Sequence, residues 1–402
     1  MMPPLVSVVI VSRNRPKELR NCIRALDFQT HRKFELIVVT DEITAAKLPD
    51  LIPIERVKSA VCAEANISKA RNQGVALAAG EIVAFIDDDA IAEPTWLNRL
   101  TAPFRDPNIG ASGGFVRGRN GISFQWRAEE VGLDGTSHAI AVDQTTVFAA
   151  DPKRAIKTQG TNCAFRIDAL RALGGFDESY KFYLDETDLN IRINQAGYST
   201  AIVPLAEVQH GYAASSMRGR DRRPKSLFEI GASHAYFIKK YDRPQSELDS
   251  VRAEQWARLD AALARGLIKA EDVEFLRSDL EAGIAEGSLR DHGRNSAAQK
   301  QSKFLQYLDT SGVAEHQFVT GRWISRRKVY AQAKEIAKAG TPCTAIILSP
   351  TTLFHHRWFH SDGFWVQTGG IFGKSTRSDP IWTWYRCATR VKVEQADLSR
   401  TR

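Results

Sequence analysis

Short hydrophobic runs alternate with amphipathic stretches along the first hundred residues. Residues 6–11 and 34–39 are nearly continuous apolar runs rich in Val and Ile, which is typical of strands buried on both faces. Between them, residues 17–28 carry apolar side chains three and four positions apart, and this spacing predicts an amphipathic helix. A strand, a helix and a second strand form a βαβ unit, so the sequence predicts a parallel pair of strands.

The next apolar run, residues 82–86, ends abruptly in three adjacent carboxylates, Asp87, Asp88 and Asp89. Because a hydrophobic core does not accommodate three unpaired acids, we expect them at the carboxyl end of a strand. Open α/β sheets bind their ligands at this edge. An oxygen-rich cluster there suits Mg²⁺ or Mn²⁺ carrying a diphosphate, and a solvated turn after the strand is the alternative.

Strands and helices continue to alternate beyond this run. Helical spacing occurs at residues 66–79 and from residue 94, a short strand is expected at 161–165, and a helix at 167–173 is followed by two glycines. Residues 110–165 are mixed and, apart from this short strand, predict no particular element. The order of the elements predicts an α/β sheet domain.

A further helix is expected from Glu186 to Gly197, which places Asp185 and Glu186 at or near its N-terminus. The helix dipole stabilises carboxylates at this position. A last short strand at 200–203 leads to His210. Two acids and a histidine therefore follow the carboxylate cluster in the chain.

The composition changes near residue 241. Residues 246–286 have the spacing of a helical pair broken near Gly266, whereas residues 343–349 read as a buried strand followed by a Gly-rich, aromatic segment. We therefore expect three parts, namely residues 1–240, a helical segment at 241–310, and an α+β extension of unknown role at 311–402. The aromatic residues of the extension suit either a carbohydrate platform or packing against the first part.

The composition limits the class of protein. Five cysteines are scattered without a Cys-x-x-Cys motif, which favours reduced thiols in a cytosolic protein and argues against a structural zinc site. The net charge of +8 suits an anionic partner, or a basic protein without one. No nucleic-acid-binding signature is present, so we expect no nucleic-acid partner. Residues 217–225 hold five basic side chains and suit a loop that closes over a diphosphate, meets anionic lipid, or is simply solvated.

Five motifs, in this order and spacing, resemble family 2 glycosyltransferases with the GT-A fold. They are residues 6–16, the Ala-Arg-Asn run at 70–72 with Gly74, and residues 85–89, 174–178 and 185–192. The resemblance covers residues 5–240 and implies that residues 1–240 are a Rossmann-like, nucleotide-sugar-binding GT-A domain. It also implies an inverting transfer from a nucleotide-diphosphate sugar to a hydroxyl, assisted by a divalent cation, Mn²⁺ or Mg²⁺.

The resemblance assigns metal and phosphate contacts to the carboxylate cluster. Asp89 matches the acid that contacts the metal, and Asp87 and Asp88 match acids near the ribose and the diphosphate. His210 matches a position where such enzymes often carry a histidine that completes the metal site. An imidazole suits Mn²⁺ better than Mg²⁺, and a structural, hydrogen-bonded histidine is the alternative.

Four further residues are expected to bind the nucleotide. Asp41 matches the residue that bonds the base, although Thr-Asp-Glu stands where the family usually has two acids followed by Gly-Ser. Arg71 matches a nucleotide or phosphate contact, with a surface arginine as the alternative. Ser12 and Arg13, in the first motif, complete this group.

The acid pair matches the catalytic position of the family. Asp185 and Glu186 stand where the family more often shows Glu-Asp, and on this register Glu186 is the general base, with Asp185 as the second choice. A carboxylate within hydrogen-bond reach can take the proton of a sugar hydroxyl as it attacks. Asp188 is expected to be a structural or capping acid in the first helical turn.

The sequence thus predicts an inverting glycosyltransferase for cell-surface glycan or polysaccharide assembly, with a glycan or lipid-linked acceptor. We expect it in the cytoplasm or peripherally at the inner face of the membrane, and its oligomeric state is open. A non-catalytic sugar-nucleotide or glycan-binding protein is an alternative. A sugar-phosphate nucleotidyltransferase is another, but it should carry a Gly-rich phosphate loop after the first strand, and residues 12–16 contain no glycine.

Overall fold

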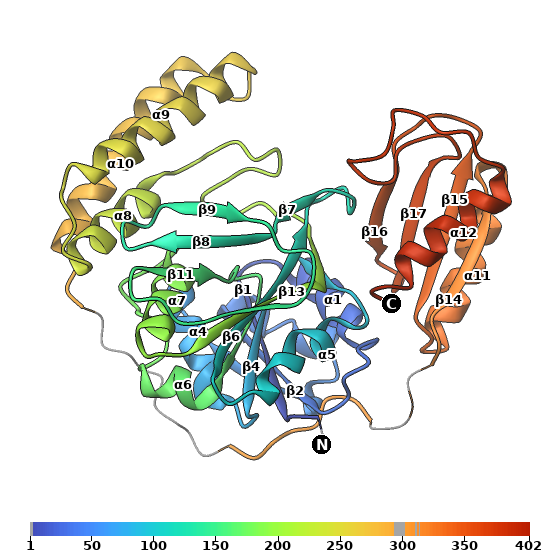
Figure 1. Cartoon of the computed structure of the whole chain (residues 1–402), viewed down its shortest axis with the longest axis horizontal. Coiled ribbons are helices and arrows are strands. Elements are labelled where there is room, and N and C mark those ends of the chain that lie inside the picture. Colours follow the sequence, from blue (N-terminus) through green and yellow to red (C-terminus); the bar gives the residue numbers. More distant parts are fainter. Residues whose placement is uncertain (1–2, 293–301, 310–311, 313) are drawn as a thin grey trace.

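A ten-stranded mixed sheet forms the centre of the N-terminal part of the chain (Figure 1). The computed structural model describes residues 3–292, 302–309, 312 and 314–402. The strands of this sheet are β1 (Val6–Ser12), β2 (Phe34–Thr40), β3 (Val57–Val61), β4 (Ile82–Asp87), β5 (Ala90–Ala92), β6 (Ile109–Arg117), β7 (Phe124–Trp126), β10 (Thr146–Phe148), β12 (Asn162–Arg166) and β13 (Ser199–His210).

The main path of the sheet runs β10-β13-β6-β12-β4-β1-β2-β3, with β5 paired to β13 and β7 paired to β6. Strand β1 pairs in parallel with both β2 and β4, which confirms the predicted βαβ unit. Strand β12 is antiparallel to β4 and β6. Strand β13 begins where the short strand was predicted but continues to His210, so this histidine ends a strand and does not follow one.

Helices cover both faces of the sheet (Figure 1). The helices of this part are α1 (Pro16–Leu26), α2 (Glu42–Ala45), α3 (Leu48–Leu51), α4 (Ile67–Leu77), α5 (Trp96–Thr101), α6 (Ile167–Ala172) and α7 (Asp185–Gln195), with 3₁₀ turns at Ile54–Arg56 and Ala102–Arg105. Helices α1 and α5 pack on the face that carries Val8 and Ile10, and α4, α6 and α7 pack on the face that carries Val9. The predicted α/β class is confirmed.

The segment between β6 and β12, which the sequence left unassigned, folds into short strands. A three-stranded sheet is formed by β8 (Ala128–Gly132), β9 (Ser137–Ile140) and β11 (Arg154–Lys157). Strands of three to five residues bounded by irregular turns carry too little periodic pattern to be recognised from the sequence.

Three helices follow β13, namely α8 (Phe228–Lys240), α9 (Glu247–Ala264) and α10 (Ala270–Leu289). The predicted helical pair corresponds to α9 and α10. Helix α8 lies along α10, where glycines allow close backbone approach: a Cβ on Gly283 would lie 2.0 Å from the carbonyl oxygen of Phe228. Residues 293–301 and 310, within the predicted 241–310 segment, lie outside the described residues.

The C-terminal extension is a four-stranded sheet with helices packed on it (Figure 1). Its elements are β14 (Gln317–Arg322), a 3₁₀ turn at Trp323–Ser325, α11 (Arg326–Lys338), β15 (Cys343–Ser349), β16 (His356–His360), β17 (Phe364–Gly370) and α12 (Cys387–Leu398). The strand order is β14-β15-β17-β16, and only β16 is antiparallel to its neighbour. The predicted mixed helical and β extension is confirmed.

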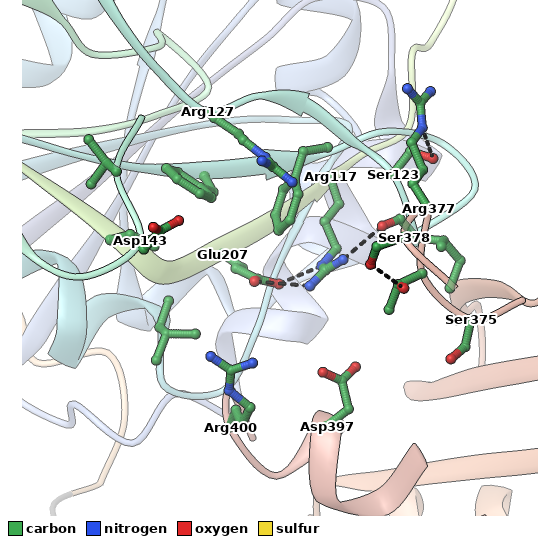
Figure 2. A pocket seen from close by; sticks show the side chains of 17 residues that line it. Arg117, Ser123, Arg127, Asp143, Glu207, Ser375, Arg377, Ser378, Asp397 and Arg400 are labelled. Atoms are coloured by element: carbon green, nitrogen blue, oxygen red, sulfur yellow. Dashed lines mark hydrogen bonds and ion pairs between the residues drawn. The ribbon is translucent and has the colours of Figure 1, made fainter. Parts of the chain in front are cut away.

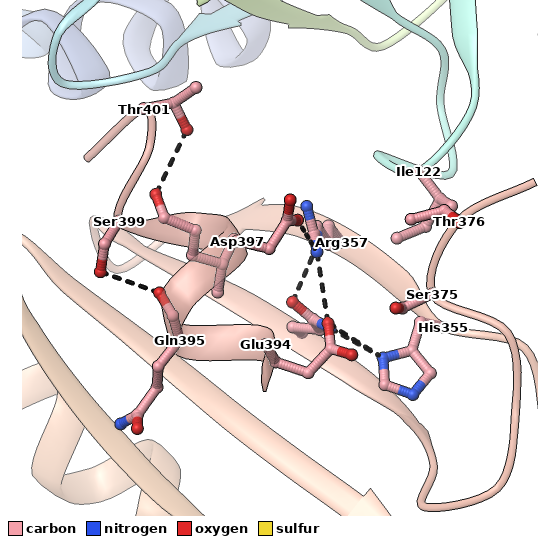
Figure 3. A network of polar contacts seen from close by, with 12 residues as sticks. Ile122, His355, Arg357, Ser375, Thr376, Glu394, Gln395, Asp397, Ser399 and Thr401 are labelled. Atoms are coloured by element: carbon pink, nitrogen blue, oxygen red, sulfur yellow. Dashed lines mark hydrogen bonds and ion pairs between the residues drawn. The ribbon is translucent and has the colours of Figure 1, made fainter. Parts of the chain in front are cut away.

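A buried polar network fixes α12 on this sheet (Figure 3). Arg357 on β16 donates to Gln367 Oε1 at 2.8 Å and to Asp397 Oδ2 at 2.8 Å, and it lies 3.4 Å from Glu394 Oε2. The amide of Gln367 donates to Glu394 Oε2 at 2.6 Å and to His355 Nδ1 at 2.7 Å. Because each buried charge has an opposite partner, the network tolerates burial.

The extension packs against α1 of the first part. Trp365 is buried and its ring centroid lies 5.6 Å from that of Phe28. Gln209 on β13 donates to the carbonyl of Arg357 at 2.7 Å. Phe359 and Trp365 therefore pack against the first part, whereas Trp382 and Trp384 are exposed. None of the helices among the described residues combines the length and the apolar character that a membrane span requires.

Candidate active site

Two carboxylates and one imidazole converge at the carboxyl end of β4. Asp87 is the last residue of β4, and His210 is the last residue of β13. His210 Nε2 lies 3.2 Å from Asp89 Oδ1 and 4.0 Å from Asp87 Oδ2, and one potential ligand atom of each residue lies within 4.8 Å of the others. The structure thus brings together the two predicted metal ligands, Asp89 and His210, with Asp87 as a third.

The imidazole of His210 is oriented by residues that the sequence did not single out. Its Nδ1 lies 2.9 Å from Gln125 Oε1, within hydrogen-bond distance, so Gln125 helps to orient the ring. Nε2, on the opposite side of the ring, faces the carboxylates of Asp87 and Asp89. Trp126 stacks on the ring with centroids 5.7 Å apart, and Tyr212 contacts it edge-on at 4.9 Å. A metal-binding histidine needs such a partner on its other nitrogen.

Asp89 is buried and ionised. Burial alone would raise its pKa, but His210, Arg15 and the backbone N–H of Ala213, which donates to Oδ2 at 2.6 Å, hold the pKa of Asp89 well below its ordinary value. An ionised carboxylate beside a second carboxylate and an imidazole nitrogen is a donor set that fits a divalent cation. The residues present therefore fit the metal that the sequence predicted.

Asp88 points away from this group. Ser12 Oγ donates to Asp88 Oδ2 at 2.8 Å, and Arg15 donates to Asp88 Oδ1 at 2.9 Å. Burial raises the pKa of Asp88 to about 7, against the attraction of Arg15. Arg15 also donates to the carbonyl of Ala214 at 3.1 Å, so Arg15 connects Asp88 to the segment after β13. The sequence missed Arg15, whose role depends on these distant partners.

Asp41 caps α2 and fixes the loop after β1. Its carboxylate accepts hydrogen bonds from the N–H of Asn14 at 2.7 Å and from the N–H and hydroxyl of Thr44, both at 3.0 Å. Burial opposes ionisation, but these bonds lower the pKa of Asp41. Arg13 donates to the backbone carbonyl of Ala63 at 2.9 Å. Both residues therefore shape the wall of the site next to β2 and β3.

The acid pair begins α7 after a strained turn. Tyr183 and Leu184 have left-handed φ values of 73° and 64°, which side chains other than glycine rarely adopt. Ser233 Oγ stabilises this turn by donating to the carbonyl of Phe182 at 2.8 Å. Asp185 is then buried, whereas Glu186 remains partly exposed. The strain is localised where the two predicted catalytic acids enter the helix.

Arg71 connects the acid pair to the metal-ligand group. Its guanidinium forms an ion pair with Asp185, lies 3.7 Å from Asp87 Oδ1 and donates to the carbonyl of Gly160 at 3.1 Å. It also lies over the ring of Phe176, 5.3 Å from the centroid. Burial raises the pKa of Asp185 to about 7, against the attraction of Arg71.

The position of Arg71 depends on how closely α4 packs on β1. A Cβ on Gly74 would lie 2.5 Å from Val9 Cγ1, so a larger residue would push the helix away. Asn72 adds a second constraint, because its side chain accepts from the N–H of Phe176 at 2.8 Å and donates to Phe176 O at 2.9 Å. In the motif at 70–74, Gly74 and Asn72 therefore fix the packing of α4, and Arg71 supplies the charged group of the site.

The remaining predicted residues fall into two groups. Asp188 is structural, as predicted, because Lys240 forms an ion pair with it, Arg192 bonds it at 2.7 Å, and Tyr241 donates to it at 3.0 Å. In the segment 217–225, burial lowers the pKa of Arg218, and the negative charge of Asp89 opposes this shift.

A separate cavity of about 380 Å³ lies between the first part and the extension (Figure 2). Arg117 and Glu207 form an ion pair at 2.5 Å on one wall, and Arg377 donates to Ser123 Oγ at 3.0 Å on another. None of the predicted site residues lines it. The cavity is therefore distinct from the carboxylate edge.

Known proteins are similar to parts of this chain. A pre-mycofactocin glycosyltransferase from Mycobacterium tuberculosis is 29% identical over 254 residues, which are 59% of this chain and 48% of the relative. Glucosyl-dolichyl phosphate glucuronosyltransferase from Haloferax volcanii is 30% identical over 180 residues, 43% of this chain and 56% of the relative. A solved structure of a mannosyltransferase from Pyrobaculum calidifontis, in complex with GDP-Man and Mn²⁺, is 18% identical with a TM-score of 0.42, and the similarity covers 72% of this chain and 88% of that one.

The chain spans between 18% and 56% of the length of the first curated relatives that it matches. Residues 7–174 match the sequence model described as glycosyl transferase family 2, and this stretch includes the carboxylate cluster and Arg71. The resemblance predicted from the five motifs is confirmed. Residues 7–174 of this chain are thus similar to glycosyl transferase family 2.

Proposed function

We propose that the protein is an inverting glycosyltransferase that moves a sugar from a nucleotide-diphosphate sugar to an acceptor hydroxyl. One observation carries the proposal: a single buried guanidinium, that of Arg71, pairs with Asp185 and lies 3.7 Å from Asp87. The group that fits a metal and the acid pair are thereby held at one edge of the sheet. Transfer requires the donor sugar and the acceptor hydroxyl to be held next to each other.

The donor is bound on the metal side of this edge. Asp87, Asp89 and His210 would hold the cation, and the imidazole favours Mn²⁺ over Mg²⁺. When bound, the cation neutralises the charge of the diphosphate. Arg15 and Arg218 add positive charge beside the same acids. Asp41, with Ser12 and Arg13, shapes the wall for the nucleoside, and Asp41 Oδ1, which accepts the N–H of Thr44, has a lone pair left for a further bond.

The acceptor is activated on the other side. Asp185 forms an ion pair with Arg71 and is buried. Glu186, in the first turn of α7, is partly exposed. Glu186 takes the proton of the acceptor hydroxyl as its oxygen forms a bond to the anomeric carbon. The bond from that carbon to the diphosphate breaks at the same time, and the electron pair leaves with the nucleoside diphosphate. Attack opposite the leaving group inverts the anomeric centre.

The acceptor is proposed to be a glycan or a lipid-linked sugar in the assembly of cell-surface glycan or polysaccharide. The Haloferax volcanii relative supports this class, since it is named for a lipid-linked sugar, glucosyl-dolichyl phosphate. A location in the cytoplasm or at the inner face of the membrane is part of the same proposal.

Nucleotide release from a panel of UDP-, GDP-, dTDP- and CMP-sugars with Mn²⁺ or Mg²⁺ tests the proposal. We expect release from one donor, increased by a matching acceptor, and lost in Asp89→Ala and Glu186→Ala. The matched control is Asp168→Ala, an exposed acid on α6 outside the site. Tight, metal-dependent binding of a sugar nucleotide without turnover, even with acceptors, would instead show a non-catalytic binding protein.

A further inference from the structure

Three parallel strands of the extension end at one edge of their sheet. Strands β14 and β15 pair in parallel, as do β15 and β17, so their carboxyl ends lie side by side. The segments that leave these ends are residues 323–325, 350–355 and 371–386. In Figure 1 the long loops after β15 and β17 lie at the upper end of the orange and red extension. We call this edge the extension edge.

Each of the three segments exposes large apolar side chains. These side chains are 50% exposed at Trp323 and up to 90% exposed at Ile324. The full set is Trp323, Ile324, Leu353, Phe354, Ile381, Trp382 and Trp384. Single exposed apolar residues are ordinary on protein surfaces, but several on adjacent loops indicate an interaction surface.

Backbone and ring contacts join two of these loops into one surface. The N–H of Phe372 donates to the carbonyl of Thr351 at 3.1 Å, and the N–H of His355 donates to the carbonyl of Lys374 at 2.8 Å. Trp384 packs on Phe372 with ring centroids 4.8 Å apart. The apolar side chains are therefore presented by a fixed scaffold and not by independent loops.

The same edge is strongly basic. Residues 322–328, 350–355 and 371–386 contain seven Lys and Arg residues and a single acid, Asp379. Arg326 lies over the ring of Trp323, 4.8 Å from the centroid, so charge and aromatic surface are in contact. The carboxylate of Asp379 accepts bonds from the N–H groups of Ser375 and Thr376, at 2.8 Å and 3.0 Å, and is used within its own turn.

The opposite end of this sheet is occupied by the first part of the chain. Phe359 and Trp365 pack with Phe28 and Ala25 of the α1 region, and Arg24 donates to the carbonyl of Ser361 in the turn between β16 and β17. Because β16 is antiparallel to β17, this turn lies at the far end of the strands from the extension edge. Arg377, in the loop after β17, also contacts the first part by donating to Ser123 Oγ at 3.0 Å. The large apolar side chains of the extension edge nevertheless remain exposed.

We propose that the extension edge docks on the surface of a membrane that contains anionic lipid. Trp side chains favour the boundary between water and hydrocarbon, and Ile, Leu and Phe insert below it. The surrounding Lys and Arg residues match the negative surface of anionic lipid. A sugar platform would use the aromatic rings but not the exposed Ile324, Ile381 and Leu353. The basic edge of a second copy would repel this one.

Flotation with liposomes tests this docking on the full-length protein. We expect the protein to float with vesicles of phosphatidylcholine and phosphatidylglycerol, and not with phosphatidylcholine alone. Phe354→Ser combined with Trp382→Ser should lower the bound fraction about tenfold. Replacing Arg327 and Lys328 by Gln should lower it less and remove most of its dependence on salt.

Matched controls separate docking from general stickiness. Phe275→Ser removes a side chain of similar exposure, 61%, from α10, and Lys153→Gln with Arg265→Gln removes two exposed charges elsewhere. These variants should float like the unaltered protein. Equal flotation of all variants, or no flotation together with concentration-dependent dimerisation or binding to a soluble polysaccharide, would overturn the proposal. Nucleotide release measured without vesicles is independent of this result, so docking and transfer can fail separately.

Discussion

The molecule has two edges at which parallel strands end, and they carry opposite chemistry. At the first, after β1, β2 and β4, the side chains are buried acids, a histidine and arginines that face one another. At the extension edge, after β14, β15 and β17, apolar and basic side chains face outward. Parallel pairing determines where the loops gather, but the residues after each strand decide which partner the edge can bind.

Each edge is supported by a buried arginine, and here too the two regions differ. Arg71 pairs with Asp185 and lies near Asp87, both of which remain next to the proposed site. Arg357 bonds Gln367 and Asp397, which belong to the scaffold of the extension. The same kind of contact therefore positions reacting groups in one region and only fixes packing in the other.

The largest expected effect is a loss of Mn²⁺ affinity and turnover when Asp89 is replaced, but not when the adjacent Asp88 is replaced. Asp89→Asn should weaken Mn²⁺ binding about a hundredfold and lower turnover about a thousandfold, because it removes a charged ligand that faces His210. Asp88→Asn is the matched control, since Asp88 faces Ser12 and Arg15 and should lose far less Mn²⁺ affinity. Electron paramagnetic resonance of Mn²⁺ measures both. Equal losses of affinity would contradict the orientation of Asp88 described above.

The acid pair provides the next test. Glu186→Gln should lower kcat about a hundredfold or more while leaving the melting temperature unchanged, because a partly exposed general base is lost. Asp185→Asn should instead lower the melting temperature, because Arg71 loses its ionised partner. Steady-state kinetics and thermal unfolding together distinguish the two roles. Retained kcat in Glu186→Gln with lost kcat in Asp185→Asn would identify Asp185 as the base.

The two buried arginines can be compared directly. Arg71→Met and Arg357→Met should each cost about 3–5 kcal/mol of unfolding free energy, because each leaves carboxylates unpaired. Under conditions where both variants are folded, Arg71→Met should lose turnover and Arg357→Met should keep it. Urea unfolding and kcat measure the two effects. A similar loss of kcat in both variants would show that the extension also positions the reacting groups.

The smallest expected effect is a dependence of stability on pH. Burial opposes ionisation of Asp177, but Lys240 at 2.7 Å and Tyr236 at 2.8 Å lower its pKa below the ordinary value of 3.8. The ionised group therefore stabilises the folded state above pH 3.8, and this contribution is lost as the pH falls through the lowered pKa.

Asp177→Asn should accordingly cost about 1–2 kcal/mol at neutral pH, since Lys240 keeps Asp188 as a second partner. The difference between the two proteins should shrink as the solution becomes acidic. Urea unfolding across the pH range measures it. A difference that stays constant with pH would exclude the ion pair as its source.

Local patterns predicted most of the first edge. The apolar runs of β1, β2 and β4, the spacing of α1, α4 and α7, and the acids that follow them are all readable from neighbouring residues. Gln125 and Arg15 were not predictable in this way. Gln125 lies in the three-residue strand β7, and its partner His210 is brought to it by the pairing of β6 with both β7 and β13.

The sequence by itself determined most of the elements, the order of the motifs and the resemblance of residues 7–174 to a known family, because periodicity and short motifs depend only on nearby positions. Only the tertiary structure decided that Asp88 turns from the metal-ligand group, that Arg71 joins Asp185 to Asp87, and that the apolar loops of the extension share one edge. These contacts join residues far apart in the chain. They follow from strand register and close packing, which no local pattern encodes.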